Sequence, residues 1–257
     1  MEELEQARSI VLEAGTFLKN REAAGHITVK GASDYVTEVD RKVQDFIQKE
    51  LGEKYPEIQF LGEEKSNEEV DLSGLVWVLD PVDGTTNLIH DYRRSSISLA
   101  LMENGQTLLG VVYQPYTDEM FWAEKGKGAC LNGRRIHVSR AETMEECMFA
   151  FGTAPYDKEK FGEESFRKIY RVFMDSQDIR RSGSAAIDMA ETAAGRIDGF
   201  FERKLSIWDY AAGRLLVSEA GGKATDFEGE ELGCAMKSSV VCGNPAIHAL
   251  LVQKYLK

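Results

Sequence analysis

The chain has 257 residues, 43% of them apolar, and can therefore bury a large core as one domain or as two closely packed halves. Its 43 acidic and 31 basic residues give a net charge of −12, which argues against a nucleic-acid partner held through phosphate contacts. Because no apolar run reaches membrane-spanning length and the first five residues include three acids, the sequence predicts a cytoplasmic protein without a membrane partner.

Two amphipathic helices are predicted in the first 50 residues. Apolar residues recur at helical spacing over residues 4–18, which predicts a first helix that ends near Asn20. Thr37, followed three residues later by Asp40, is typical of a helix start, and residues 39–47 supply that second helix with a buried face.

Two strands and an acidic motif follow. Residues 58–61 predict a short strand that ends at Gly62-Glu63-Glu64, and the apolar run 75–79 predicts a strand buried on both faces. That run leads into a predicted tight, charged turn, Asp80-Pro81-Val82-Asp83-Gly84-Thr85-Thr86-Asn87. Two carboxylates held about 4 Å apart repel by about 4 kcal/mol at an effective dielectric constant near 20, so they need a cation or protons. Oxygen ligands favour Mg²⁺, although this motif alone also fits an ordinary turn.

Strand and turn signals continue through the rest of the first half, which we place at residues 1–139. Apolar runs at 97–102 and 108–113 flank Asn104-Gly105, and further runs at 120–123 and 128–131 precede another Asn-Gly turn. This pattern predicts an antiparallel meander. Together with the two helices it makes an α+β half.

The second half, residues 140–257, changes to an alternation of short strands and helices. The predicted strands lie near 148–151, 179–181, 199–201 and 240–242, and the predicted helices near 161–174, 185–194, 210–220 and 246–256. Such alternation is typical of an α/β layer.

The motif at residues 80–87 closely resembles the signature of the inositol monophosphatase family, a group of Mg²⁺-dependent phosphomonoesterases. Gly62-Glu63-Glu64 lies upstream at the expected distance, and Trp208-Asp209-Tyr210-Ala211-Ala212-Gly213 with Glu219-Ala220-Gly221-Gly222 resembles the second family signature. The likeness runs from about Lys30 to the C-terminus. It implies an α/β (α+β) fold, a layered αβαβα sandwich of the inositol monophosphatase and fructose-1,6-bisphosphatase type.

The resemblance also implies roles for individual residues. Two or three Mg²⁺ ions would be held by Glu63, Asp80, the Val82 carbonyl, Asp83 and Asp209. The implied catalytic residues are Glu63, Asp83 and Thr85, with Thr85 and Glu63 orienting and deprotonating a metal-activated water that attacks phosphorus directly. The implied substrate contacts are Asp83, Gly84, Thr85, Gly183, Ser184, Ala185, Glu202 and Asp209.

Several positions keep a second interpretation. Asp209 begins a predicted helix and could serve only as its N-terminal cap, while Arg180 and Arg181 could be a solvated surface pair. Asp40 is expected on the outer side of the metal site. The spacing from Lys30 to Asp34 is one residue shorter than the family pattern, which leaves a role for Lys30 open.

The predicted function is hydrolysis of inositol monophosphate or a similar small phosphorylated polyol or sugar, and the family resemblance also implies lithium inhibition and a homodimer. NADP(H) phosphatase or fructose-1,6-bisphosphatase activity on the same fold is an alternative, and so is a regulatory binding protein that retains the fold. A haloacid dehalogenase-type phosphatase is disfavoured, since Pro81 occupies the position where that class needs its nucleophilic aspartate.

Overall fold

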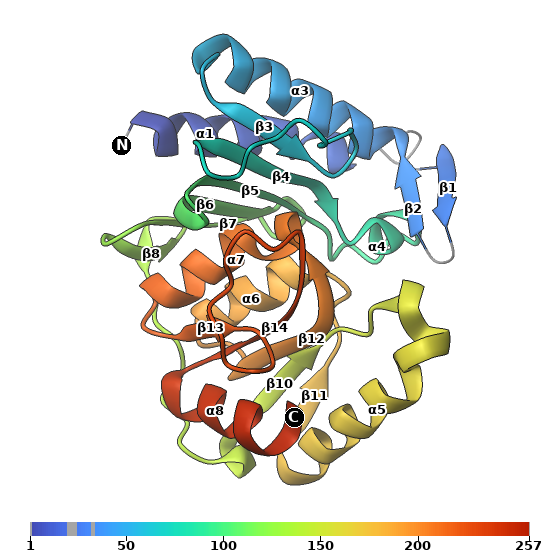
Figure 1. Ribbon diagram of the computed structural model, residues 1–257, viewed down its shortest axis with the longest axis vertical. Helices are drawn as coiled ribbons and strands as arrows, with labels where there is room; N and C mark the ends of the chain where they lie inside the picture. Colours follow the sequence, from blue (N-terminus) through green and yellow to red (C-terminus); the bar gives the residue numbers. More distant parts are fainter. Residues whose placement is uncertain (1, 20–24, 32–33, 257) are drawn as a thin grey trace.

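The computed structural model describes residues 2–19, 25–31 and 34–256, which form five alternating layers of helices and sheets (Figure 1). The helices are α1 (Glu2–Ala14) and α3 (Glu38–Lys54) in one outer layer, α6 (Ala185–Ala193) and α7 (Ile207–Glu219) in the middle, and α5 (Lys158–Asp175) and α8 (Pro245–Leu250) in the other outer layer. The predicted αβαβα sandwich is confirmed.

The first sheet has seven strands in the order β3-β4-β5-β6-β7-β8-β9. They are β3 (Gln59–Gly62), β4 (Val76–Asp83), β5 (Ser96–Glu103), β6 (Gln106–Gln114), β7 (Glu119–Glu124), β8 (Gly128–Leu131) and β9 (Arg134–Arg135). β3 is parallel to β4, and every later neighbour is antiparallel. The predicted meander is therefore confirmed.

The second sheet has five strands in the order β11-β10-β12-β14-β13. They are β11 (Asp178–Arg180), β10 (Met148–Phe151), β12 (Gly199–Ser206), β14 (Lys237–Gly243) and β13 (Lys223–Thr225). β10 is parallel to both of its neighbours, whereas β14 is antiparallel to β12 and β13. The predicted strands and helices of this half are present, and β13 is an addition to them.

Three apolar clusters hold the layers together. One lies between the two sheets and includes most of the buried residues of α6 and α7. The other two join each sheet to its outer helices. Because apolar residues from both sheets share the middle cluster, α7 is held against strands on each side. The predicted boundary between two halves of the chain at residue 139 stays a prediction.

Several local features differ from the sequence prediction. The first helix ends at Ala14 and is followed by a 3₁₀ turn (Phe17–Lys19), and the predicted end at Asn20 lies outside the described residues. A hairpin of β1 (Ile27–Gly31) and β2 (Asp34–Thr37) precedes α3 and was not predicted. The final predicted helix is split into α8 and a π-helical segment, Leu251–Leu256.

The strand that leads into the acidic motif is also longer than predicted. β4 continues through Asp83 instead of turning at Asp80, and a short helix, α4 (Thr85–Ile89), follows Gly84. The prediction that the chain turns at Asp80 was wrong, because Asp80 and Asp83 still pair with Ser98 and Ser96 of β5. Among the helices that the structure describes, none has the length and apolar character needed to cross a membrane.

Candidate active site

The carboxyl end of β4 brings two aspartates to the same side of the sheet. Asp80 lies opposite Ser98 of β5, but Asp83 lies opposite Ser96, so β4 contains one residue more than its partner at this point. Side chains of a regular strand alternate between faces, which would send residues three apart to opposite sides. The extra residue is a β-bulge, and it lets Asp80 and Asp83 approach a common space.

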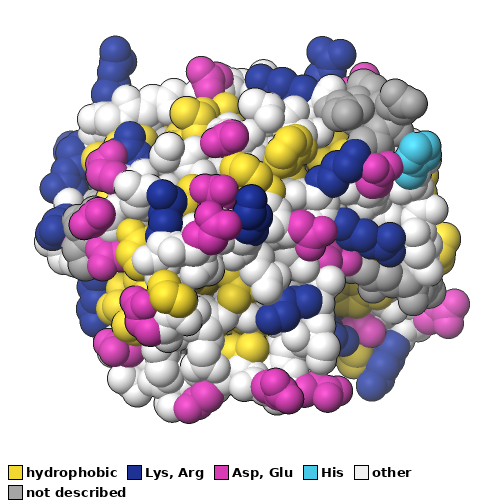
Figure 2. All heavy atoms as spheres, turned by 90° about the horizontal axis from the view of Figure 1, so that it is seen from above, with side chains coloured by type: hydrophobic (Ala, Val, Ile, Leu, Met, Phe, Trp, Pro, Cys, Tyr) yellow, Lys and Arg dark blue, Asp and Glu magenta, His cyan; other side chains and the backbone are white. Residues whose placement is uncertain are grey.

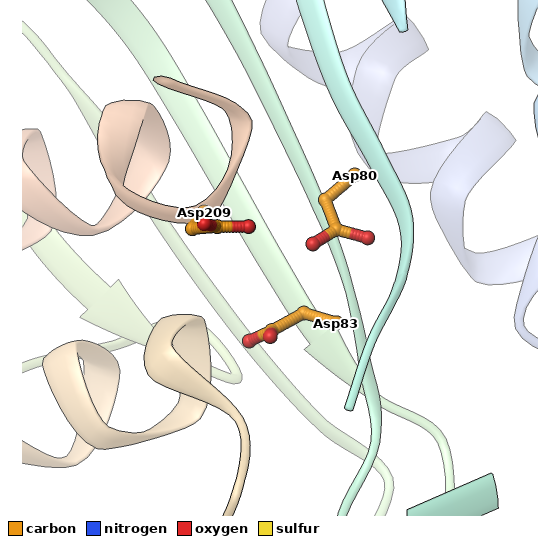
Figure 3. Close-up of side chains that lie close together, drawn as sticks. All are labelled: Asp80, Asp83 and Asp209. Carbon is orange, nitrogen blue, oxygen red and sulfur yellow. The ribbon is translucent and has the colours of Figure 1, made fainter. Parts of the chain in front are cut away.

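Asp209 reaches the same space from the first turn of α7. Its Oδ2 accepts a hydrogen bond of 2.7 Å from the backbone nitrogen of Ser206, which completes a capping box with the Ser206 side chain. The helix was predicted to begin at Tyr210 with Asp209 as its cap, whereas in the structure it begins at Ile207, Ser206 is the N-cap, and Asp209 is the N3 residue of the capping box. The cap does not keep the carboxylate away from the other acids, as Figure 3 shows.

Asp80, Asp83 and Asp209 form a compact carboxylate cluster (Figure 3), with one oxygen from each lying within 4.8 Å of the others. Burial is the main reason that the pKa of Asp80 and of Asp209 is raised well above the ordinary value, and the neighbouring carboxylates add to it. The pKa of Asp83 is raised to about 6, again mainly by burial. A divalent cation would remove this repulsion, and hard oxygen donors fit Mg²⁺.

Asp83 also connects β4 to the start of α6. Its Oδ2 accepts hydrogen bonds from the Ser184 hydroxyl at 2.5 Å and from the Ala186 backbone nitrogen at 2.7 Å. Ser184 is the N-cap of α6 and receives a hydrogen bond from Ile187. Gly183, just before it, has a φ of 83°, a left-handed conformation that favours glycine. The carboxylate thus fixes the helix terminus beside the cluster.

Asp40 is the partner of Thr85. The Thr85 hydroxyl oxygen lies 2.9 Å from Asp40 Oδ1 and 3.1 Å from the Val82 carbonyl oxygen. The other oxygen of Asp40 accepts a hydrogen bond of 2.8 Å from the Thr37 backbone nitrogen. The sequence predicted the Thr37–Asp40 helix start, which the capping box confirms, but it did not predict the contact with Thr85. The Thr-x-x-Asp spacing was the available signal.

A cavity of about 580 Å³ opens beside the carboxylate cluster. Most of the predicted site residues line it, namely Glu63, Asp83, Gly84, Thr85, Gly183, Ser184, Ala185, Glu202 and Asp209. Glu63 follows β3, next to β4, and its charge contributes to the raised pKa of Asp80 and Asp209. Asp80 and Val82 are buried in β4 behind the lining. The structure therefore brings the predicted site residues to one place.

Glu202 forms a distinct wall of the cavity. It lies on β12, and its Oε1 accepts a hydrogen bond of 2.8 Å from the Ala154 backbone nitrogen. Burial is the main cause that raises its pKa to about 7. A Cβ atom at Gly152 would come within 1.8 Å of Glu202 Oε2, so this position has no room for a side chain.

Residues that the sequence analysis did not single out also shape the site. Asn87, the last residue of the motif, donates from Nδ2 to the carbonyl oxygens of Arg94 and Ser182 and so ties the motif to the segment before α6. Asp188 of α6 is buried at the cavity wall. The side chain of Lys30 lies outside the described part of the structure.

Comparison with known proteins matches this geometry to a family. The family model described as "Inositol monophosphatase family" matches residues 1–256. The chain is 41% identical over 222 residues to an inositol-1-monophosphatase of Rhizobium meliloti, covering 86% of this chain and 82% of that protein. It is 39% identical over 218 residues to Nus factor SuhB of Escherichia coli, covering 85% and 81%.

A solved structure agrees over the whole length. The extragenic suppressor protein SuhB of Bartonella henselae superposes with a TM-score of 0.93 at 36% identity, covering 100% of this chain and 99% of that one. With the sequence signatures, the layered sandwich and the carboxylate cluster all in agreement, the chain belongs to the inositol monophosphatase family.

Proposed function

We propose that the protein is a Mg²⁺-dependent phosphomonoesterase that hydrolyses inositol monophosphate or a similar small phosphorylated polyol or sugar. The observation that carries this proposal is the convergence of Asp80, Asp83 and Asp209, whose oxygens lie within 4.8 Å of one another beside a cavity of about 580 Å³. Asp80 and Asp83 are buried and Asp209 is half-buried, and three carboxylates gathered in this way are costly without a cation, so the cluster is best explained as a metal site.

The metal ligands in this proposal are Glu63, Asp80, the Val82 carbonyl, Asp83 and Asp209, which would hold two or three Mg²⁺ ions. When bound, Mg²⁺ supplies positive charge that attracts the phosphate ester and lowers the pKa of water. This local positive charge would offset the repulsion between an anionic substrate and a protein of net charge −12.

The remaining roles follow from the contacts of the protein itself. Because the Thr85 hydroxyl donates a hydrogen bond to Asp40, the Thr85 oxygen could take a proton from the attacking water while its own proton passes to Asp40 Oδ1. Glu63, on the same cavity, is the second acceptor for that water. Attack is direct, so no phosphorylated side chain forms.

The substrate would lie between the α6 terminus and β12. Gly183, Ser184 and Ala185 line the cavity where α6 begins, and a helix N-terminus attracts anions. Glu202 lines the other side and would accept hydrogen bonds from substrate hydroxyls. This pairing of an anion site with a hydroxyl acceptor favours a phosphorylated polyol.

A phosphate-release assay with four substrates tests the proposal: inositol monophosphate, fructose 1,6-bisphosphate, NADP(H) and a 3′-phosphoadenosine nucleotide, each with and without Mg²⁺. We expect release that requires Mg²⁺, is fastest with inositol monophosphate and is inhibited by lithium but not by sodium. Fastest release from NADP(H) or fructose 1,6-bisphosphate would replace the substrate assignment with one of these alternatives. No Mg²⁺-dependent release from a folded sample would overturn the enzymatic proposal.

A second candidate function is a regulatory binding role on the same fold. It is favoured by the name of the Escherichia coli relative, Nus factor SuhB. The phosphatase assay separates the two functions, since a purely regulatory protein would release no phosphate from any substrate of the panel.

A further inference from the structure

A second cavity lies at the other end of α7 from the carboxylate cluster. Its volume is about 550 Å³, close to the value of about 580 Å³ for the proposed active site, and a cavity of this size fits a small molecule. Arg214, Leu215, Ser218 and Glu219 line it from the C-terminal half of α7. At a rise of about 1.5 Å per residue, Glu219 lies about 15 Å along the helix from Asp209. The two cavities are therefore separate sites on one helix.

The other walls of this second cavity come from both sheets. The β5–β6 turn (residues 104–107) and Lys125, just after β7, belong to the first sheet, and β13 (Lys223–Thr225) belongs to the second. The loop of residues 231–234 lines the remaining side. The cavity is thus a product of the packing of α7 between the two sheets.

Arg214 places a buried positive charge beside this cavity, since the residue is only 9% exposed. Its Nε donates a hydrogen bond of 2.8 Å to the Thr107 hydroxyl oxygen, and its Nη2 donates one of 2.8 Å to the Gly105 carbonyl oxygen. Its Nη1 donates to the carbonyl oxygens of Leu232 and Gly233. All of these acceptors are neutral, and within residues 2–19, 25–31 and 34–256 no carboxylate forms an ion pair with Arg214.

A buried cation without an acidic partner is costly, because burial removes the water that would otherwise stabilise its charge. Burial accordingly lowers the pKa of Arg214 below its ordinary value. The guanidinium nitrogens already donate to oxygens of the protein, so Arg214 would act on a ligand through its charge rather than through direct contact. An anion in the cavity would supply the missing negative charge.

Two lysines add to the positive charge of this cavity. Lys125 and Lys223 both line it and are exposed. The ammonium group of Lys125 donates a hydrogen bond to the side-chain oxygen of Gln106, which is a neutral partner. Because an ammonium group has three N–H donors, both lysines can donate hydrogen bonds to a ligand.

Two acids also line the cavity, but backbone amides already occupy one of them. Glu219 accepts hydrogen bonds of 2.7 and 2.6 Å from the backbone nitrogens of Gly126 and Gly128, which orient its carboxylate toward the turn after β7. Glu231 is exposed, and the solvent screens its charge. Three cations against two acids leave the lining positive, although the protein has a net charge of −12. A lining of this sign attracts anions.

We propose that this cavity binds a small organic anion, whose phosphate or carboxylate group is held by Lys125 and Lys223 beside the charge of Arg214. A bare inorganic ion would fill only a small part of about 550 Å³, so the ligand has an organic part. Leu215 and Leu232 supply apolar surface for that part. The inference does not depend on the phosphatase activity, because none of the proposed active-site residues lines this cavity.

The reactivity of Cys234 tests the proposal, because this exposed thiol belongs to the lining and reports whether the cavity is occupied. Alkylation by iodoacetamide, a neutral reagent, is followed at each cysteine by peptide mass spectrometry without Mg²⁺. The anionic probes are phenylphosphonate, which has no ester bond to hydrolyse, and benzoate, and benzamide is the neutral control. We expect one or both anions to slow the alkylation of Cys234 in a saturable manner, while benzamide has no effect. Cys130, which does not line the cavity, should react at an unchanged rate.

The two anionic probes distinguish the possible ligands. Protection by phenylphosphonate alone identifies a phosphate site, and protection by benzoate alone identifies a carboxylate site. The absence of protection by either anion overturns the proposal, and so does equal protection by benzamide.

Charge variants test which residues hold the anion. The double variant Lys125→Gln, Lys223→Gln should need at least about 10-fold more anion for half protection of Cys234, because charge-assisted hydrogen bonds are lost. Lys49→Gln, Lys54→Gln removes the same charge from exposed positions of α3 and should behave like the parental protein. Parental protection in the first variant, or equal weakening in both, overturns the assignment. Circular dichroism verifies the fold of each variant.

Discussion

At the scale of single residues, Asp83 connects two parts of the site. One of its oxygens belongs to the cluster with Asp80 and Asp209, and Oδ2 accepts hydrogen bonds from Ser184 and Ala186. It therefore joins the proposed metal site to the helix terminus at which the phosphate would lie. Replacing this carboxylate separates its electrostatic role from its structural one.

We expect Asp83→Asn to reduce the rate of phosphate release by at least about 100-fold, equivalent to about 2.7 kcal/mol of transition-state stabilisation. The amide is neutral and binds Mg²⁺ more weakly, but its oxygen can still accept hydrogen bonds from Ser184 and Ala186. Calorimetric titration with Mg²⁺ and steady-state kinetics measure the two effects. A parental rate in this variant would remove Asp83 from the metal site.

Thr85 has a role that depends on its hydroxyl group alone. Thr85→Ala should lower kcat by roughly 10²- to 10⁴-fold, because the hydroxyl held by Asp40 is lost as a proton acceptor. Thr85→Ser keeps the hydroxyl and should stay close to the parental kcat. Mg²⁺ affinity should be similar in both variants. Equal kcat values for the Ala and Ser variants would show that the hydroxyl takes no part in the reaction.

The raised pKa of Asp83 makes stability depend on pH when Mg²⁺ is absent. The pKa of the Asp83 carboxyl group is about 6 in the folded protein and 3.8 ordinarily, so the folded protein holds the proton more tightly than the unfolded chain does. This difference stabilises the folded protein in full below pH 3.8, and the stabilisation is lost as the pH rises through 6. We expect the free energy of unfolding of Asp83→Asn to rise relative to the parental protein over this range in chelator. Urea unfolding at several pH values measures the difference. A difference that stays constant with pH would contradict the assignment.

At the scale of whole elements, the position of α7 depends on a close approach to the first sheet. A Cβ atom at Gly110 of β6 would lie 2.9 Å from both the Cα and the carbonyl oxygen of Ala212 in α7. Because those are backbone atoms, they cannot rotate away. The glycine therefore lets α7 lie close enough to the sheet for Asp209 to reach the cluster.

Gly110→Ala should destabilise the protein by about 1–3 kcal/mol, because α7 has to move away from β6. Phosphate release should fall as well, since that movement displaces Asp209. Gly52→Ala is the matched control: Gly52 is an exposed residue of α3 with no neighbour within 4 Å of the added atom. It should stabilise by up to about 1 kcal/mol. Urea unfolding distinguishes the two directions.

At the scale of the whole molecule, charge is distributed unevenly between surface and interior. Figure 2 shows acidic and basic side chains intermixed over the face formed by α1 and α3, despite the net charge of −12. The buried acids are instead concentrated at the cavity, where Asp83, Asp188 and Glu202 are all less than 10% exposed. The acids at the cavity are therefore the place where we expect a cation to bind.

Mg²⁺ should consequently stabilise the entire fold. The proposed ligands come from β4 in the first sheet and from α7 in the central layer, so binding would connect elements that separate on unfolding. At a Mg²⁺ concentration of about 100 times its dissociation constant, we expect about 2.7 kcal/mol of added stability. Thermal unfolding with Mg²⁺ and with chelator measures it, and Asp209→Asn should reduce the shift. An unfolding temperature unaffected by Mg²⁺ would argue against a metal site.

The sequence by itself determined the local elements. Hydrophobic periodicity and turn residues predicted the meander, the helix start at Thr37 and Asp40 and a helix near 210–220 that in the structure begins at Ile207, because these depend on residues close along the chain. The spacing of the acidic motif also identified the residue types that a divalent cation needs.

Only the tertiary structure decided how distant segments meet. The bulge between Asp80 and Asp83 depends on pairing with β5, and the contact between Thr85 and Asp40 depends on how α3 packs against β4. Asp209 joins the cluster because α7 is packed between two sheets at a distance that Gly110 permits. The spacing of residues along the chain determines which helices and strands form. The distance between side chains far apart in sequence is set by the packing of buried apolar surfaces.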